Sequence, residues 1–294
     1  MDDLISLYQE RLNLQNANFS RIEHDDAMVA VVYRITQASG SQLILKICPR
    51  DEDYRRELYF LKYFADKLPV PQIVQEVPPS AGMKGALLME CLPGELLKTT
   101  TMTDALAYEI GALLAKIHLN PAAGYGDLTQ PESLCLDPRV YFTLKFEEGI
   151  EECINHLPKE LTRQCRHYYD THIHLLGAVD GPCMIHRDFR PGNVIVHEGK
   201  LQGIIDWAGG RGSFAEEDFC PMEHWEWPMH PSSKKSFLDG YASIRPVPNY
   251  SAIMPLLRLS RALNVVGFTV KHGIWKTNYA RVYEFNRQFL ETFF

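Results

Sequence analysis

A short polar stretch, HRDFRPGN at residues 186–193, concentrates groups that could do chemistry. It contains an aspartate, an asparagine and two arginines: Asp188, Asn193, Arg187 and Arg190. The apolar runs MI before it and VIV after it should hold these polar side chains at the edge of a hydrophobic core. An ordinary solvated turn is the alternative. The flanking runs favour a reactive site.

The next segment of the chain, NVIVHEGKLQGIID, predicts a β-hairpin. We expect a two-residue type II′ turn at Gly199-Lys200, because this turn places glycine first. Counting outward from that turn puts Asn193 opposite Asp206, and directly opposed residues lie about 5 Å apart. Carboxylate and amide oxygens suit Mg²⁺ when waters and phosphate oxygens complete its shell. The prediction depends on the register, because a shift by one residue separates the pair.

The elements that must position these residues follow from hydrophobic periodicity. Alternating or continuous short apolar runs predict strands, and a 3.6-residue repeat predicts helices. The predicted strands before the hairpin are 19–24, 28–36, 42–48, 70–77 and 85–91, and the predicted helices are 2–12, 51–68 and 103–119. A strand-rich first third therefore precedes a mainly helical remainder, with a short crossing near 91–97.

Composition and charge narrow the classes of function. The chain has 294 residues, seven cysteines without a C-x-x-C motif, and a formal charge of −7. We expect reduced core thiols. We also expect a soluble, cytoplasmic protein, because neither a signal peptide nor an apolar run of membrane-spanning length occurs. The expected oligomeric state is a monomer or homodimer. The negative charge argues against nucleic-acid binding and favours a cationic partner.

The loop and the IIDW sequence after the hairpin together resemble the aminoglycoside phosphotransferase and choline kinase families, which are relatives of the protein kinases. The family pattern is H-x-D-x-x-x-x-N, a short hairpin, then I-D-W or I-D-F. The resemblance implies an α+β bilobal fold, with a small β-rich nucleotide-binding lobe and hinge over 1–93 and a larger helical lobe over 94–294. It also implies transfer of the γ-phosphate of ATP, or of GTP, to a hydroxyl group.

The same resemblance assigns roles within the loop and hairpin. Asp188 would orient the acceptor hydroxyl and take its proton, while Asn193 and Asp206 would carry Mg²⁺. Trp207 would serve packing, and His186 would support the loop by hydrogen bonding. Phosphoryl transfer demands mostly positioning and charge stabilisation from the protein.

The nucleotide site implied by the resemblance lies in the first third of the chain. A lysine in the middle of the apolar strand LILKI needs a partner for its charge, and in related kinases a helix glutamate supplies it. Lys46 and Glu57 are the matching residues. The segment LLMECLPGE resembles the hinge between the two lobes of these kinases. There the backbone of Glu90 and Leu92 would meet the edge of the adenine base, with Met89 behind it.

The chain departs from the family pattern at several positions. Arg187 stands where glycine is common and Arg190 where histidine is frequent. We expect a carboxylate such as Asp218 to pair with Arg187. The first hairpin, EHDDAMVAV at 23–31, contains no glycine. A loop that covers the nucleotide phosphates here would therefore lack the G-x-G-x-x-G form. This departure bears on nucleotide affinity rather than on the fold.

Acidic residues suggest the chemistry of the acceptor, which should be small because the chain lacks a long activation segment. The acceptor-binding residues expected are Glu216, Asp218, Glu223, Trp225 and Glu226, and glutamates at 147–152 add a second acidic cluster. For Asp218 a structural role is the alternative, because the family has an aspartate near this place that braces the catalytic loop. Carboxylates beside aromatic rings suit a cation, and an aminoglycoside-like antibiotic is the preferred acceptor. Choline or another amino alcohol or sugar, and a macrolide or peptide antibiotic, stay open. So do a catalytically silent binding module and a merely solvated acidic face.

Overall fold

The computed structural model describes residues 3–23, 30–277 and 279–294. The chain forms two compact units. Met1–Thr101 and Pro191–Gly210 make the N-terminal unit, and Met102–Arg190 and Arg211–Phe294 make the helical unit. The segment 191–210, expected in a lobe spanning 94–294, therefore belongs with the N-terminal unit. Strand pairing and aromatic stacking hold it there.

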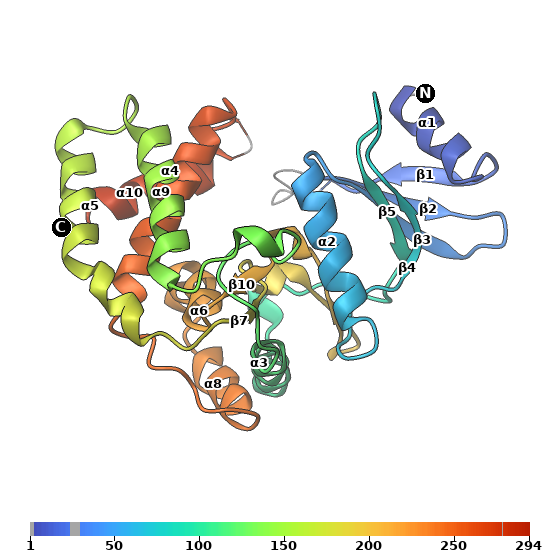
Figure 1. Cartoon of the computed structure of the whole chain (residues 1–294). Helices are drawn as coiled ribbons and strands as arrows, with labels where there is room; N and C mark the ends of the chain where they lie inside the picture. Colours follow the sequence, from blue (N-terminus) through green and yellow to red (C-terminus); the bar gives the residue numbers. More distant parts are fainter. Residues whose placement is uncertain (1–2, 24–29, 278) are drawn as a thin grey trace. The chain divides into compact units, whose positions relative to one another are not determined.

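The N-terminal unit contains a five-stranded antiparallel sheet in the order β1-β2-β3-β5-β4. The helices α1 and α2 lie beside this sheet (Figure 1). The bounds are α1 Asp3–Arg11, β1 Asn18–Arg21, β2 Val31–Thr36, β3 Gln42–Ile47, α2 Asp51–Phe64, β4 Ile73–Val77 and β5 Ala86–Glu90. Tyr8 and Leu12 at the end of α1 join a core that the sheet residues complete. Each of these elements matches a segment predicted from periodicity.

The alternation of side chains along β3 explains how a lysine is buried in this unit. Leu45 and Ile47 face the core shared with α1. Lys46 lies between them, so its side chain points to the opposite face of the sheet. Lys46 is nevertheless only 7% exposed. A lysine is rarely buried to this extent unless carboxylates pair with its charge.

A three-stranded sheet in the order β6-β8-β9 completes the N-terminal unit. Its strands are Glu95–Leu96, Val194–His197 and Lys200–Ile204. The β8–β9 hairpin is present as predicted, but its turn lies one residue earlier. His197 pairs with Lys200, and the central residues Glu198 and Gly199 both have positive φ, 50° and 73°. This is the type I′ pattern rather than the expected type II′ pattern.

The register predicted for the hairpin is wrong by one residue. A bulge lies between the pairs Ile195–Gly203 and Val196–Leu201. The backbone N–H of Ile205 donates to the carbonyl of Asn193 at 2.9 Å, so Asn193 stands opposite Ile205 and not opposite Asp206. Asp206 adopts a left-handed backbone conformation, φ 67°, at the end of the hairpin. Its position is therefore set by this turn and by the burial of the adjacent Trp207, rather than by pairing with Asn193.

The helical unit is built from helices around one short pair of strands. Its helices are α3 Asp104–His118, α4 Pro138–Cys153, α5 Lys159–His172, α6 Glu216–Pro221, α7 Trp227–Met229, α8 Ser233–Ala242, α9 Met254–Lys271 and α10 Ala280–Glu291, and its strands are β7 Cys183–Ile185 and β10 Arg211–Ser213. α3 packs against α8, and α4 and α10 pack against α9. Thr103 caps α3 by accepting from the N–H of Leu106. The predicted helix 103–119 is confirmed.

Two further expectations concern the first hairpin and membrane-spanning helices. The loop of the first predicted hairpin, within 23–31, falls largely on residues 24–29, which lie outside the described residues. In the described part of the chain, no helix is both long and apolar enough to cross a membrane.

Candidate active site

Two carboxylates of the N-terminal unit converge on the buried ammonium group of Lys46. Lys46 on β3 donates to Oε2 of Glu57 at 2.7 Å and to Oδ1 of Asp206 at 2.8 Å. Glu57 is almost fully buried in α2, whereas the side chain of Asp206 is 48% exposed. Burial by itself would lower the pKa of the Lys46 ammonium, but the carboxylates of Asp206 and Glu57 outweigh it and raise that pKa above its usual value. The lysine is held charged and in a fixed position.

Aromatic stacking brings Asp206 to this lysine. The next residue, Trp207, is fully buried. Its ring stacks on Phe60 of α2 at a centroid distance of 5.5 Å and packs at a tilt against Phe64 at 4.9 Å. Glu57 lies on the same helix one turn before Phe60, so one helix face positions both carboxylates. A Cβ on Gly210 would come within 2.6 Å of the Phe60 ring, so glycine is needed there for this close approach. The packing role expected for Trp207 fits this arrangement.

The strand expected to meet the adenine base is β5. Met89 is buried, Glu90 is exposed, and Leu92 lies just beyond the strand. The N–H of Glu90 donates to the carbonyl of Gln72 at 2.9 Å, so this N–H is already engaged within the unit. The adenine-binding role of these residues stays a prediction.

Asp188 belongs to the helical unit, where two arginines flank its carboxylate. Nε of Arg190 lies 3.1 Å from Oδ2, and Nη2 of Arg261 lies 3.2 Å from Oδ1. Burial by itself would raise the pKa of the Asp188 carboxyl, whereas Arg190 and Arg261 lower it, and the net result is a pKa well below its usual range. With 35% of its side chain exposed, Asp188 is an accessible carboxylate that stays ionised.

Asp218 braces the loop that carries Asp188. Its carboxylate is completely buried and accepts from the backbone N–H groups of His186 and Arg187. It also accepts from Nε2 of His118 at 3.1 Å, and because a carboxylate only accepts, His118 must carry its proton on that nitrogen. Arg187 thus meets Asp218 through its main chain and not through the expected side-chain ion pair. Full burial and three internal donors remove Asp218 from the acceptor-binding set.

The other residues expected to bind a cationic acceptor also have partners within the helical unit. Glu216 is buried and accepts from the N–H of Asp180, which removes it from the acceptor-binding set as well. Glu223 pairs with Lys234 at 2.6 Å, and Trp225 packs edge-on against Phe285. Glu226 is half-buried. Of the carboxylates described over 216–226, Glu216 and Asp218 are therefore buried and Glu223 is neutralised.

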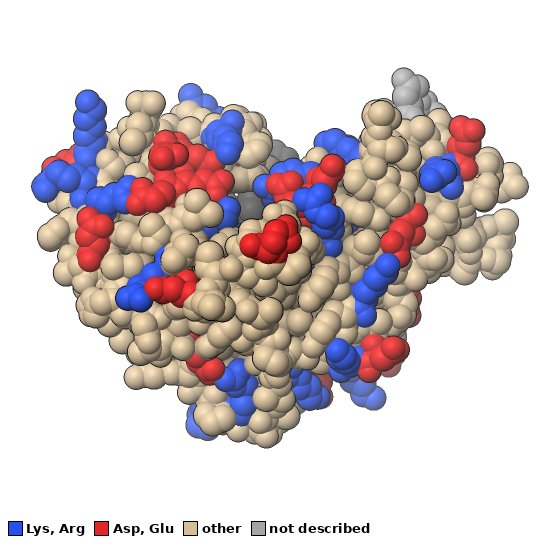
Figure 2. Space-filling view, in the orientation of Figure 1, with Lys and Arg blue, Asp and Glu red and all other residues tan. Residues whose placement is uncertain are grey.

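The second acidic cluster, on α4, is also largely neutralised. Figure 2 shows acidic side chains gathered over α4 and α9 with basic ones beside them. The ion pairs are Glu147–Arg166, Glu148–Lys145 and Glu152–Lys271. This cluster is therefore a network of surface ion pairs, and it offers little net charge to a cationic ligand.

Two residues that support the loop belong to no motif predicted from the sequence. His118 ends the apolar helix α3, and Arg261 interrupts the apolar pattern of α9. A polar residue on the buried face of a helix is a signal that some partner exists. The signal does not say which partner, because Arg261 meets Asp188 across 73 positions of sequence.

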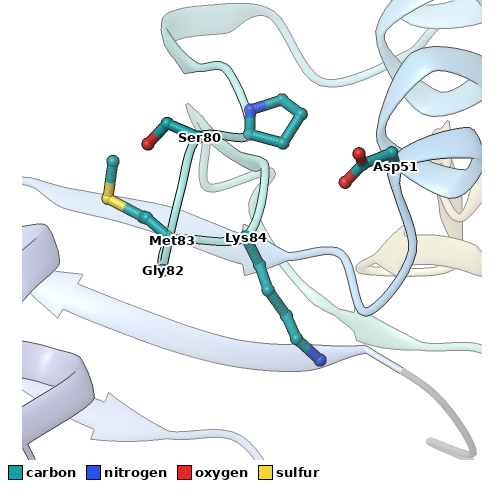
Figure 3. A pocket seen from close by; sticks show the side chains of 6 residues that line it. Asp51, Ser80, Gly82, Met83 and Lys84 are labelled. Atoms are coloured by element: carbon teal, nitrogen blue, oxygen red, sulfur yellow. The ribbon is translucent and has the colours of Figure 1, made fainter.

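A separate hollow of about 480 Å³ lies on the N-terminal unit, between the β4–β5 loop and the start of α2 (Figure 3). Asp51, Ser80, Met83 and Lys84 are among its lining residues. The side chain of Lys84 points away from Asp51, so the hollow gathers no convergent charges. None of the three residues around the Lys46 ammonium lines it.

Solved structures share this fold at low sequence identity. A thermostable mutant of aminoglycoside phosphotransferase APH(4)-Ia, in a ternary complex with AMP-PNP and hygromycin B, is 11% identical, with a TM-score of 0.71 over 99% of this chain and 98% of that one. ADP-bound aminoglycoside phosphotransferase APH(2'')-Ib is 16% identical, with a TM-score of 0.64 over 99% and 98%. A putative fructosamine-3-kinase from Thermobifida fusca is 18% identical, with a TM-score of 0.67 over 99% and 100%.

Sequence comparison identifies the family. A search of curated proteins found no match. The sequence model of the phosphotransferase enzyme family matches residues 24–246, which include the lysine strand, the HRDFRPGN loop and the hairpin. The kinase-like fold expected from the loop motif is confirmed, and the chain belongs to the phosphotransferase enzyme family.

Proposed function

We propose that the protein is a small-molecule kinase that transfers the γ-phosphoryl group of ATP to a hydroxyl group of its acceptor. The observation that carries this proposal is the Lys46 ammonium, held at once by Glu57 and Asp206. Burying a charge is costly even when carboxylates pair with it, so a cation held in this way is expected to serve a purpose other than stability. In phosphoryl transfer, such a cation stabilises the nucleotide phosphates.

The residues that fit magnesium are Asn193 and Asp206. Lys46 engages one oxygen of Asp206 in a side chain that is half exposed. Asn193 would supply an amide oxygen. Among the described residues no group of three or more His, Cys, Asp or Glu side chains could hold a metal. Mg²⁺ does not require one, since it keeps waters and phosphate oxygens around one or two protein ligands. When bound, Mg²⁺ would neutralise charge on the phosphates.

Asp188 would act on the acceptor. Its carboxylate stays ionised, so it can accept the hydrogen bond of an incoming hydroxyl and orient the oxygen toward phosphorus. The arginines on both sides restrict the carboxylate to one geometry. Positioning of this kind, more than proton abstraction by a strong base, is what phosphoryl transfer demands.

The aminoglycoside-like acceptor expected from the sequence has limited support from the chain itself. An aminoglycoside phosphotransferase of the same fold was solved with hygromycin B, so aminoglycosides belong among the acceptors to be tested. However, most of the carboxylates expected to hold a cation are buried or paired. Amino alcohols, sugars and other antibiotics therefore belong in the same panel.

A coupled assay of ADP release tests the proposal. The full-length protein is incubated with Mg²⁺ and with ATP or GTP, across aminoglycosides, macrolides, peptide antibiotics, amino alcohols, sugars and hydroxy acids. We expect ADP release that requires both Mg²⁺ and one acceptor class. A chain that binds nucleotide yet releases no ADP with any of them would be a binding module, and the proposal would be wrong.

A further inference from the structure

Arginines gather in the loop that carries Asp188 and on neighbouring elements of the helical unit. The arginine cluster consists of Arg187, Arg190, Arg211, Arg258 and Arg261. Arg190 and Arg261 bind Asp188 itself. Arg211, at the start of β10, is 5% exposed in its side chain, pairs with Glu217 and lies over the Tyr141 ring. These contacts fix several guanidinium groups near one reactive carboxylate.

Arg258 extends the cluster along α9. It lies three residues before Arg261, so both side chains project from the same face of that helix. Nε of Arg258 lies 3.4 Å from Nδ1 of His224, whose Nε2 faces the side-chain oxygen of Asn286 at 3.0 Å. Because that amide oxygen accepts, His224 carries its proton on Nε2 and offers Nδ1 to Arg258.

The histidine does not add to the positive charge. Burial, followed by the charge of Arg261, lowers the pKa of His224 to about 3. Its ring is therefore neutral at physiological pH and serves to orient Arg258. The guanidinium of Arg258 also lies over the Phe289 ring, 4.7 Å from the centroid. Two aromatic side chains thus hold the arginine without neutralising it.

The cluster holds more arginines than ion-paired carboxylates, although Glu217 and Glu148 also act on Arg187 electrostatically. Within the described part of the chain, the guanidinium groups of Arg187 and Arg258 have no ion pair with a carboxylate. Asp188 and Glu217 form ion pairs with three of the arginines. The carboxylate of Asp218 accepts from backbone N–H groups and from His118. The like charge of Arg211, followed by burial, lowers the pKa of Arg187 to about 10, as expected for a cation held beside another cation.

We propose that the acceptor carries an anionic group, a carboxylate or a phosphate, close to the hydroxyl that is phosphorylated, and that the arginine cluster binds this group. Guanidinium groups suit both anions because their paired N–H donors match two oxygens at once. The inference rests on the proposed kinase function, and it replaces a cationic acceptor by an anionic one.

With such an acceptor, the bond formed in the transfer step is matched by a bond broken. The acceptor hydroxyl oxygen forms a bond to the γ-phosphorus as the bond from that phosphorus to the β–γ bridging oxygen breaks. The electron pair of the broken bond leaves with ADP, and the hydroxyl proton passes to the carboxylate of Asp188 and then to solvent. The arginine cluster changes no bond; it holds the anionic group so that the hydroxyl lies against Asp188.

Direct binding of anions tests the site without any turnover. The full-length protein, without nucleotide, is titrated calorimetrically with inorganic phosphate and with glycerate. Arg258→Gln and Arg187→Gln should each weaken binding about tenfold or more, the usual effect of losing a charge-assisted hydrogen bond. Arg163→Gln is the matched control, because this arginine on α5 is 70% exposed and pairs only with Glu160 among the described residues. No anion binding, or equal weakening in all variants, would overturn the proposal.

Matched acceptors separate this inference from the proposed function. ADP release is measured with glycerate, glycerol and 3-amino-1,2-propanediol, and with gluconate, glucose and glucosamine. The acid of each set should have the lowest KM, and Arg258→Gln should raise that KM while leaving the KM of ATP unchanged. Preference for the amines would refute the anionic acceptor and leave the kinase function intact. Anion binding by a chain that releases no ADP with any acceptor would refute the kinase function and leave the anion-binding site intact.

Discussion

At the scale of single residues, the ionisation of Asp188 decides how the site works. The two guanidinium groups beside it hold the carboxyl pKa below its usual range. A carboxyl whose pKa is lowered in the folded state is protonated only when the pH falls through that lowered value. The negative charge is therefore constant across the neutral range, and Asp188 acts through its position.

Asp188→Asn should lower turnover by ~10²–10⁴-fold, the range typical of a positioned general base. The ratio of wild-type to variant turnover should stay constant from about pH 5.5 to about pH 8.5, because the ordinary aspartate pKa is near 4 and the arginines lower it further. Acceptor-dependent ADP release across this range measures both quantities. Near-normal turnover would contradict the assignment. A ratio that shrinks toward pH 5.5 would contradict the lowered pKa.

The residues of the site differ in how far sequence could identify them. Lys46, Glu57, Asp188 and Asp206 each stand in a local motif whose spacing is fixed by one strand, helix or hairpin. Arg261 belongs to no such motif, because only the packing of α9 brings it to Asp188. Side chains that meet through tertiary packing leave no periodic signal.

At the scale of elements, the Lys46 site joins β3, α2 and the turn after β9. Glu57 and Asp206 reach one ammonium because Trp207 fixes the turn against α2. Glu57 is buried and depends on the lysine for its counter-charge, whereas Asp206 is half exposed and keeps contact with water. The Lys46–Glu57 pair should therefore matter for stability as well as for nucleotide binding.

Lys46→Met should lower the free energy of unfolding by about 3–5 kcal/mol, because it leaves the Glu57 carboxylate buried without its partner. The double variant Lys46→Met with Glu57→Met should recover most of this loss, since an apolar pair of similar size avoids the desolvation cost. Urea unfolding followed by circular dichroism gives both values. A single variant as stable as the wild type would show that Glu57 does not depend on Lys46.

The hairpin shows why element types were easier to predict than registers. The strands β8 and β9 follow from their apolar runs, but Gly199 suits the first position of a type II′ turn and the second of a type I′ turn. The structure uses the second, with Glu198 in a left-handed conformation that few non-glycine residues adopt. The bulge adds a further shift, and neither feature is encoded by alternation of apolar and polar residues.

At the scale of the whole molecule, the net charge and the placement of the charges point to different acceptors. The chain carries −7, which led to the expectation of a cationic ligand. Glutamates at 147, 148 and 152 are paired on the surface, whereas arginines far apart in sequence gather around Asp188. Summed charge describes long-range attraction, but the contacts that select a ligand depend on where the charges are placed.

Two sets of residues have separate tasks in the proposed kinase: Lys46 and Asp206 bind Mg²⁺-ATP, and Asp188 acts only on the acceptor. The most direct test is a calorimetric titration of the full-length protein with ATP, in the presence and absence of Mg²⁺, for the wild type, Asp206→Ala and Asp188→Asn. We predict that Asp206→Ala abolishes the gain in affinity that Mg²⁺ gives the wild type, while Asp188→Asn binds Mg²⁺-ATP within a few fold of the wild type. Unchanged Mg²⁺ dependence in Asp206→Ala, or loss of ATP binding in Asp188→Asn, would contradict this division of roles.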